Sequence, residues 1–175
     1  VESLYAPDTH PVAQLIAEEA IGALARSLPR IAADPRDVDA RTQAQYGAWL
    51  CGTCMAMTMG LHHKICHVLG GTFDLPHAQT HAVMLPHVIR YNAPAVGELY
   101  GWLAEDARLC AASDAGAAER LAQRISELTA QSGLPTHLSD CGVDRGLLPV
   151  LAHEAATQWT AQFNPRPVSE ADFHA

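Results

Sequence analysis

Imidazole side chains, which can bind metal ions and exchange protons near neutral pH, gather in a short part of this sequence. Six of the ten histidines lie within residues 62–87. His63 and His67 are four residues apart, and so are His77 and His81; this spacing puts each pair on one face of a helix. Because a short glycine-containing segment joins the two pairs, they can converge on one point. Neutral imidazole is a common ligand of zinc, iron and nickel, so the spacing suggests a metal site.

Each of these histidines also has a simpler interpretation, as a buried, hydrogen-bonded core residue or a helix-cap contact. Metal sites of this kind usually combine histidine with Asp or Glu, and the only acid nearby is Asp74. A loop aspartate is more often solvated than bound to metal. The spacing therefore indicates a site but does not complete it.

The neighbours of these histidines carry further reactive groups. His62 and Lys64 flank His63, and on a helix they should point to other faces. Lys64 is either an attractor for an anionic substrate or an ordinary exposed lysine. Cys66 is either a nucleophile or, because it diverges from its neighbour His67 on a helix, a packed thiol.

Hydrophobic periodicity and capping signals predict an all-α fold of about seven or eight helices, with no strand hairpin. Gly70-Gly71 should end the helix that carries His63, as a glycine C-cap, and Ser169 should cap a last short helix after a non-helical tail at residues 164–167. The expected helices cover Thr9–Leu28, residues 35–59, 61–69, 76–91, 95–112, 114–132 and 144–163.

The segment over residues 49–57 is apolar nearly all round, which predicts a helix buried at the centre of a bundle. Gly47 and Gly52 should let a neighbouring helix approach it closely. Cys51 and Cys54 in this segment form a Cys-x-x-Cys pattern. Since no βαβ context surrounds them, we expect buried thiols in a reducing cytoplasm rather than a redox pair.

Composition narrows the classes of function. The formal net charge of −8 argues against binding to nucleic acid, which requires a basic face. No apolar run is long enough to span a bilayer, so we expect no membrane partner either. Residues 1–5 read as the end of a helix already under way, which predicts that the chain is a fragment.

Residues 60–92 hold a longer ordered pattern. His63, three residues, His67 and Leu-Gly are followed by Pro-His, Leu-Pro and Tyr-Asn. This pattern resembles the signature of the iron-containing alcohol dehydrogenase family. Its version here, His-His-Lys-x-Cys-His-Val-Leu-Gly-Gly with Pro-His-Ala after it, resembles the maleylacetate reductase branch. Motifs elsewhere resemble that branch as well, at Leu4–Asp8, Gly133–Thr136 and Asn164–Pro167.

The resemblance implies a two-domain, dehydroquinate synthase-like enzyme in which residues 1–175 form the all-helical C-terminal bundle domain. An α/β domain that binds NADH or NADPH would precede it, with the active site in the cleft between the two domains. The resemblance also implies a homodimer.

Family members hold one divalent metal, iron or zinc, with an aspartate and three histidines. By resemblance, two of these ligands match His63 and His77, and the other two are expected just before Val1. His67 matches the family histidine that lies near the nicotinamide of the cofactor. We expect the fragment alone to be inactive.

The reaction that the resemblance implies is the reduction of maleylacetate to 3-oxoadipate in the breakdown of aromatic compounds. A metal, or hydrogen bonds from His63, His67 and His77, would stabilise the enolate that hydride transfer leaves, and His67 would supply the proton. The substrate is a dianion, for which Lys64, His62 and protonated histidines are the local binding candidates.

Two other functions remain open at this stage. One is a metal-dependent alcohol dehydrogenase that acts on a small alcohol or aldehyde. The other is a histidine-rich helical module that binds a metal or a partner protein without catalysis, which the absence of a phosphate-binding glycine motif would favour.

Overall fold

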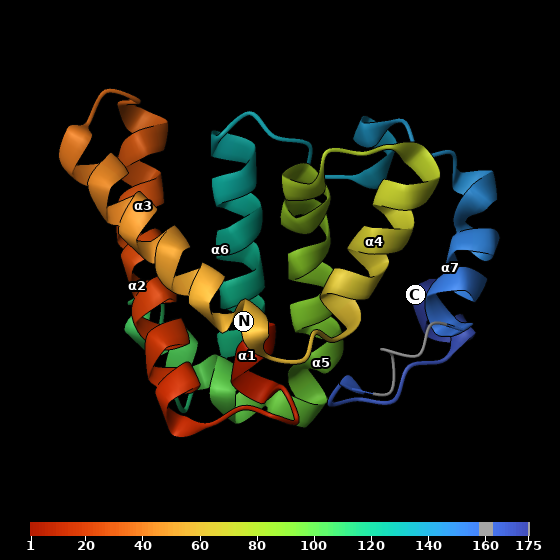
Figure 1. Cartoon of the computed structure of the whole chain (residues 1–175), viewed down its shortest axis with the longest axis horizontal. Helices are drawn as coiled ribbons and strands as arrows, with labels where there is room; N and C mark the ends of the chain where they lie inside the picture. Colours follow the sequence, from red (N-terminus) through yellow and green to blue (C-terminus); the bar gives the residue numbers. More distant parts are fainter. Residues whose placement is uncertain (158–162, 175) are drawn as a thin grey trace.

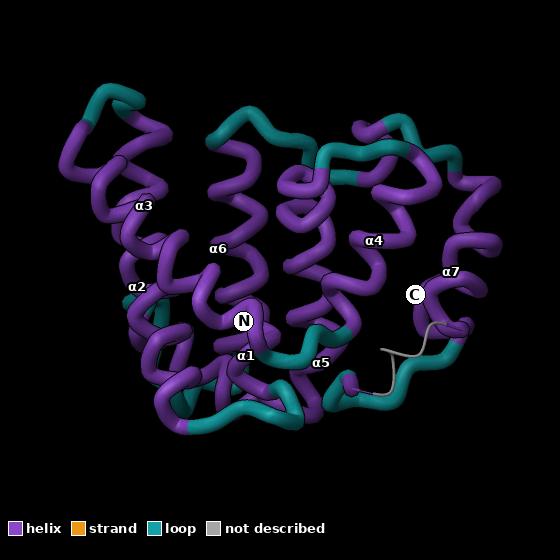
Figure 2. The backbone as a smooth tube through the Cα atoms, viewed as in Figure 1, coloured by secondary structure: helices purple, strands orange, loops and turns teal. Residues whose placement is uncertain are grey.

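The computed structural model describes residues 1–157 and 163–174, and this part of the chain is helical throughout, without a strand (Figures 1 and 2). The predicted all-α class is confirmed. The α-helices are α1 (Glu2–Tyr5), α2 (Pro11–Ala33), α3 (Val38–Thr53), α4 (Leu61–Phe73), α5 (His77–Asp106), α6 (Ala117–Gln131) and α7 (Leu148–Thr157). Short 3-10 turns lie at Cys54–Ala56, Leu138–Cys141, Arg145–Leu147 and Glu170–His174.

The long helix α5 belongs to both halves of the molecule. On one side it packs with α1, α2 and α6 around a core that includes Leu4, Ile89 and Tyr100. On the other side it packs with α4 and α7 around a second core that includes Leu69 and Leu151. Figure 1 shows the α2–α3 pair at one end and α7 at the other, with α5 and α6 between them. The segment that carries the histidines is therefore held by two cores.

Helix α4 extends beyond its predicted end. It runs through Gly70-Gly71 to Phe73 and stops at Asp74, whose φ of 53° lies in the left-handed region. The expectation that the two glycines end the helix is wrong, because they keep helical backbone angles and the left-handed cap is an aspartate. Aspartate visits this conformation more readily than most residues other than glycine.

The two helices predicted over 76–91 and 95–112 meet at a kink inside α5, so the prediction of two helical stretches is confirmed. The backbone leaves helical geometry at Val96, with φ −131° and ψ 26°. Pro94 lies just before the kink, and a proline removes one backbone hydrogen bond and crowds the preceding turn. Asn92 and Pro94 thus mark the place where one helical stretch ends and the next begins.

Helix α3 differs most from expectation. It ends at Thr53 rather than near residue 59, and its second half is not buried, since Trp49 is 65% exposed. The helix lies at the edge of the molecule beside α2 (Figure 1), so an apolar face without a neighbour stays in solvent. The close approach predicted at Gly47 is confirmed, because an added Cβ would meet Leu24 Cγ at 3.0 Å, whereas Gly52 has open space around it.

Smaller corrections concern the ends of other elements. Helix α2 begins at Pro11 rather than Thr9 and is capped by His10, with His10 Nδ1 accepting from the backbone N–H of Ala13 at 3.2 Å. Both cysteines of the Cys-x-x-Cys pattern are free thiols, but only Cys54 is buried and Cys51 is exposed. Residues 158–162 of the last predicted long helix lie outside the described residues.

The tail after α7 is fastened to α5 by buried amides. Asn92 Nδ2 donates to Asn164 Oδ1 at 2.9 Å, and Asn164 Nδ2 donates back to Asn92 Oδ1 at 2.8 Å. Arg166 donates to the carbonyl of Tyr91 and lies over its ring. The non-helical tail and the short helix after Ser169, here a 3-10 turn, are confirmed.

Across the described ranges, no helix combines the length and the apolar character that crossing a lipid bilayer requires.

Candidate active site

Five imidazoles from α4 and the start of α5 form one cluster. His81 lies at its centre, with ring centroids 4.5 Å from His62, 4.6 Å from His63 and 4.3 Å from His77. His67 stacks on His77 with their centroids 5.7 Å apart. The two pairs of histidines therefore converge, as their four-residue spacings predict, because α4 and α5 turn the pairs toward each other.

His62 belongs to this cluster, contrary to the expectation that it points to another face. Its side chain is 6% exposed, and its Nε2 lies 3.0 Å from the backbone carbonyl of His81. A carbonyl only accepts hydrogen bonds, so Nε2 of His62 carries the proton. The ring reaches the cluster because α5 lies beside α4, so the adjacent residues His62 and His63 of α4 both contact His81 of α5.

The carboxylate that the histidine spacing lacked comes from α1. Glu2 is 4% exposed, and its two oxygens accept the backbone N–H groups of His62 at 2.7 Å and His63 at 3.2 Å. The same carboxylate lies 2.5 Å from His63 Nδ1. Glu2 thus caps the positive end of α4 and contacts the cluster at once. Sequence reasoning missed it, because nothing in local spacing links residues 60 positions apart.

Burial keeps the inner imidazoles neutral. Desolvation lowers the pKa of His62 to about 4, against the opposing charge of Glu2. Desolvation, reinforced by the neighbouring His62, His63 and His77, lowers the pKa of His81 to about 3. Neutral imidazoles can bind a metal or accept a proton at physiological pH.

Glu2 stays ionised inside the protein. Burial pushes the pKa of its carboxyl upward, but the interactions with His62 and His63, first among them the hydrogen bond from the His63 side chain, outweigh that effect and lower the pKa. A buried anion beside neutral rings makes this part of the site the place where a cation or a proton is best stabilised.

His67 and His77 form the open edge of the cluster, since both side chains are exposed while His62 is buried. Desolvation and the nearby His63 and His77 lower the pKa of His67. The cluster thus runs from a buried end at Glu2 and His62 to a solvent-accessible end, where an outside molecule can reach the rings.

Lys64 and Cys66 are both in the interior. Lys64 is 2% exposed and burial lowers its pKa to about 8, so the alternative of an ordinary exposed lysine is wrong. Cys66 is fully buried and burial raises its pKa to about 12. Because the thiolate is the nucleophile, this thiol is unreactive and the packed-thiol interpretation is confirmed.

The cluster fits a divalent metal. Ligand atoms of His62, His63 and His81 all lie within 4.8 Å of one another, and three imidazoles with a carboxylate behind them suit iron or zinc. In addition, His81 Nε2 is buried and lacks a hydrogen-bond partner among the described residues. Such an orphaned nitrogen is a free ligand position. His77, expected as a ligand, lies next to this set rather than within it.

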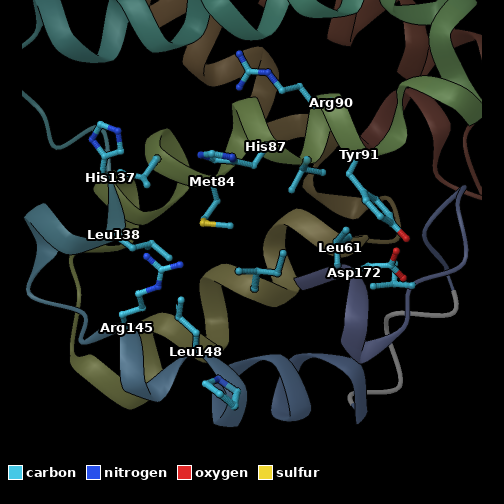
Figure 3. Close-up of a pocket in the computed structure, with 15 residues that line it drawn as sticks. Leu61, Met84, His87, Arg90, Tyr91, His137, Leu138, Arg145, Leu148 and Asp172 are labelled. Atoms are coloured by element: carbon cyan, nitrogen blue, oxygen red, sulfur yellow. The ribbon is translucent and has the colours of Figure 1, made fainter. Parts of the chain in front are cut away.

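Two cavities flank the α4–α5 pair. The smaller, about 360 Å³, is bordered by Glu2, His62, His63 and His81. The larger, about 820 Å³, lies between α4, α5 and α7 and is lined mainly by aliphatic side chains, as Met84, Leu61 and Leu148 show in Figure 3. We take the smaller one as the candidate active site, because Glu2 and three imidazoles of the cluster border it, whereas no imidazole of the cluster lines the larger one.

Comparisons with known proteins identify relatives of this chain. The model of the Fe-containing alcohol dehydrogenase family, C-terminal, matches residues 1–175. Maleylacetate reductase of Pseudomonas sp. (strain P51) is 43% identical over 172 residues, which are 97% of this chain and 46% of that protein. The crystal structure of maleylacetate reductase from Agrobacterium tumefaciens superposes with a TM-score of 0.82 at 39% identity, covering 98% of this chain and 46% of that one.

A structure of 1,3-propanediol oxidoreductase superposes with a TM-score of 0.86 at 32% identity, over 98% of this chain and 46% of that one. The chain thus spans a little under half the length of the relatives that it matches. Match length, sequence identity and helical architecture lead to one conclusion: this chain belongs to the Fe-containing alcohol dehydrogenase family, in the C-terminal region of that family.

Proposed function

We propose that this chain is the helical, catalytic part of a nicotinamide-dependent reductase that converts maleylacetate to 3-oxoadipate. The observation that carries the proposal is the cluster of five imidazoles with one open end, backed by a buried carboxylate. Relatives named maleylacetate reductase support the choice of substrate.

The proposal includes a second domain. An N-terminal α/β domain would bind NADH or NADPH, and residues 1–175 would form one helical domain that closes the cleft from the other side. His67 is our candidate for the residue next to the nicotinamide, because its side chain is exposed at the open end of the cluster. A homodimer is part of the same proposal.

The chemistry is a conjugate reduction. A reduced nicotinamide, when bound, would supply hydride for the alkene carbon that is β to the ketone, and the electron pair of the double bond would shift to give an enolate. Protonation of the enolate carbon then yields the saturated ketone and the oxidised cofactor. One hydride and one proton are consumed, and His67, which solvent can reach, supplies that proton.

The other histidines serve the developing enolate oxygen. His63 and His77 both lie beside the central His81 and would donate hydrogen bonds, and His63, with His62 and His81, would hold a metal. A divalent metal, when bound there, supplies a Lewis acid that polarises the ketone. His62 is neutral and donates its one N–H to the carbonyl of His81, so it would help to shape the pocket without giving the substrate a charge, and Lys64 would contribute positive charge.

Alanine variants of the full-length protein test this assignment. We expect His63→Ala and His67→Ala to lower kcat for maleylacetate by about 10²–10⁴-fold, the usual effect of removing acid–base or electrostatic groups. His153→Ala is the matched control, since that histidine is exposed and pairs with Glu170 away from the cluster. Near-normal turnover in His63→Ala and His67→Ala would remove both residues from the active site.

A second candidate function is a metal-dependent alcohol dehydrogenase acting on a small alcohol or aldehyde. The fit of the cluster to a metal and the superposition with 1,3-propanediol oxidoreductase favour it. A substrate panel with and without a chelator separates the two. Alcohol oxidation that the chelator abolishes, together with no turnover of maleylacetate, would select the alcohol dehydrogenase.

A further inference from the structure

We propose that Glu2 is the positioning residue of His63: by accepting a hydrogen bond from Nδ1, it fixes the ring and leaves Nε2 as the nitrogen with the free lone pair. This inference rests on the proposed function, which places His63 in the active site. It assigns a role to a residue of α1, outside the two helices that carry the histidines.

The geometry around the carboxylate supports the assignment. Glu2 Oε2 lies 2.5 Å from His63 Nδ1 and 3.2 Å from the backbone N–H of His63, and Oε1 accepts from the backbone N–H of His62 at 2.7 Å. An ionised carboxylate can only accept hydrogen bonds. Neutral His63 must therefore carry its proton on Nδ1, which exposes the lone pair of Nε2.

The surroundings keep Glu2 in place. Its neighbour Leu4 is 3% exposed in the core shared by α1, α2, α5 and α6, so α1 is anchored. Gly60 leaves room for the carboxylate, because a Cβ there would lie 2.8 Å from Glu2 Oε1. The carboxylate is thus held by the anchored helix α1, by its hydrogen bonds and by the close fit at Gly60, as required of a group that must fix a reactive ring.

Such a carboxylate matters for either role of His63. A histidine that binds a metal or accepts a proton through Nε2 almost always donates its other N–H to a carboxylate or carbonyl, which fixes the tautomer and raises the basicity of the ring. Removing the orienting group typically lowers metal affinity or activity by about 10- to 100-fold.

The sharpest variant is Glu2→Gln, which keeps the shape and changes one acceptor into a donor. If the amide oxygen keeps the short bond to the His62 N–H, the amide NH₂ faces His63 and donates to Nδ1. That moves the proton of the ring to Nε2 and removes the lone pair there. Glu119→Gln is the matched control, because Glu119 is exposed and pairs with Arg90 on another face.

The tautomer of His63 is measured directly by ¹⁵N NMR of the histidine-labelled full-length protein, with the signal assigned through His63→Gln. We expect an Nδ1–H tautomer in the wild type and in Glu119→Gln, and an Nε2–H tautomer in Glu2→Gln. An Nε2–H tautomer in the wild type would overturn the proposal, even if Glu2→Gln proved unable to fold.

Kinetics then separate this inference from the proposed function. We expect Glu2→Gln to lower kcat by about 10- to 100-fold with a smaller change in KM. A switched tautomer with unchanged kcat would show that Glu2 orients His63 but that His63 takes no part in the reaction. The assignment of His63 to the active site would then be wrong, and with it the positioning role of Glu2. An unswitched tautomer with reduced kcat would overturn the role of Glu2 while leaving the active site standing.

Discussion

At the scale of single residues, the site depends on a close fit between α1 and the start of α4. Gly60 is the N-cap residue of α4, and its missing side chain is what lets the Glu2 carboxylate reach the first amides of the helix. An acid at this place is both a cap and a part of the cluster, so stability and chemistry are coupled there.

Gly60→Ala tests this fit. An added Cβ would lie 2.8 Å from Glu2 Oε1, and displacing a buried carboxylate should lower the free energy of unfolding by about 1–3 kcal/mol. Urea denaturation provides the measurement. Gly52→Ala is the control, since Gly52 is helical with open space around it and should stay unchanged or gain up to about 1 kcal/mol. Equal stability of Gly60→Ala and the wild type would contradict the fit.

The sequence predicts part of this cluster and misses the rest for identifiable reasons. Helical spacing is local information, and it brought His63, His67, His77 and His81 together correctly. His62 and Glu2 depend on which elements lie side by side, His62 through α5 and Glu2 through α1. No periodicity reports such long-range neighbours, so both residues required the structure.

At the scale of elements, α5 is the support of the site, and its packing against the loop that follows it is tight. Gly101 lies on α5 where the chain returns over it, and an added Cβ there would lie 2.2 Å from the backbone carbonyl oxygen of Ala112. A backbone atom cannot swing aside as the end of a flexible side chain can, so the loop or the helix would have to move.

We therefore expect Gly101→Ala to lower the free energy of unfolding by about 2–4 kcal/mol through overpacking. Gly97→Ala, one turn earlier on the same helix with nothing within 4 Å of an added Cβ, should be neutral or gain up to about 1 kcal/mol from better helix propensity. Differential scanning calorimetry of the two variants compares them. Similar melting temperatures for both would refute the close approach.

Element boundaries show why helices were easier to predict than their packing. The all-α class followed from periodicity and from the scarcity of β-branched residues. The burial of α3 did not follow, because an apolar composition does not reveal whether a neighbour covers each face; Trp49 and Met55 remain 65% and 59% exposed. The break predicted after Asn92 and Pro94 lies at Val96, where two helical stretches meet at a kink within α5.

At the scale of the whole molecule, folding buries groups that would otherwise titrate near pH 6.5. The unfolded chain protonates its histidines there, whereas His62 and His81 in the folded protein have pKa values of about 4 and about 3. Both face Glu2 and His63, and His81 also faces His77. Between these values the unfolded state binds more protons, so acidification favours unfolding.

Stability should therefore be fully present above about pH 6.5 and fall as the pH drops toward 4, by up to about 1.4 kcal/mol per pH unit for each such group. Glu2 adds to the loss at lower pH, because its folded pKa is lowered. Urea denaturation at pH 7 and pH 5 measures the slope. His62→Gln should flatten it, while His153→Gln, at an exposed histidine, should not. A pH-independent stability of the wild type over this interval would contradict the buried neutral state.

The paired amides of Asn92 and Asn164 have a consequence for the orientation of α5 about its own axis. Asn92 lies about three helical turns after His81 and so projects from nearly the same side of the helix. Each amide donates one hydrogen bond to the other and accepts one in return. Rotating α5 by one residue would break both hydrogen bonds and leave two buried amides without partners. The C-terminal tail thus fixes the rotation of α5 about its axis, and with it the direction in which His81 projects.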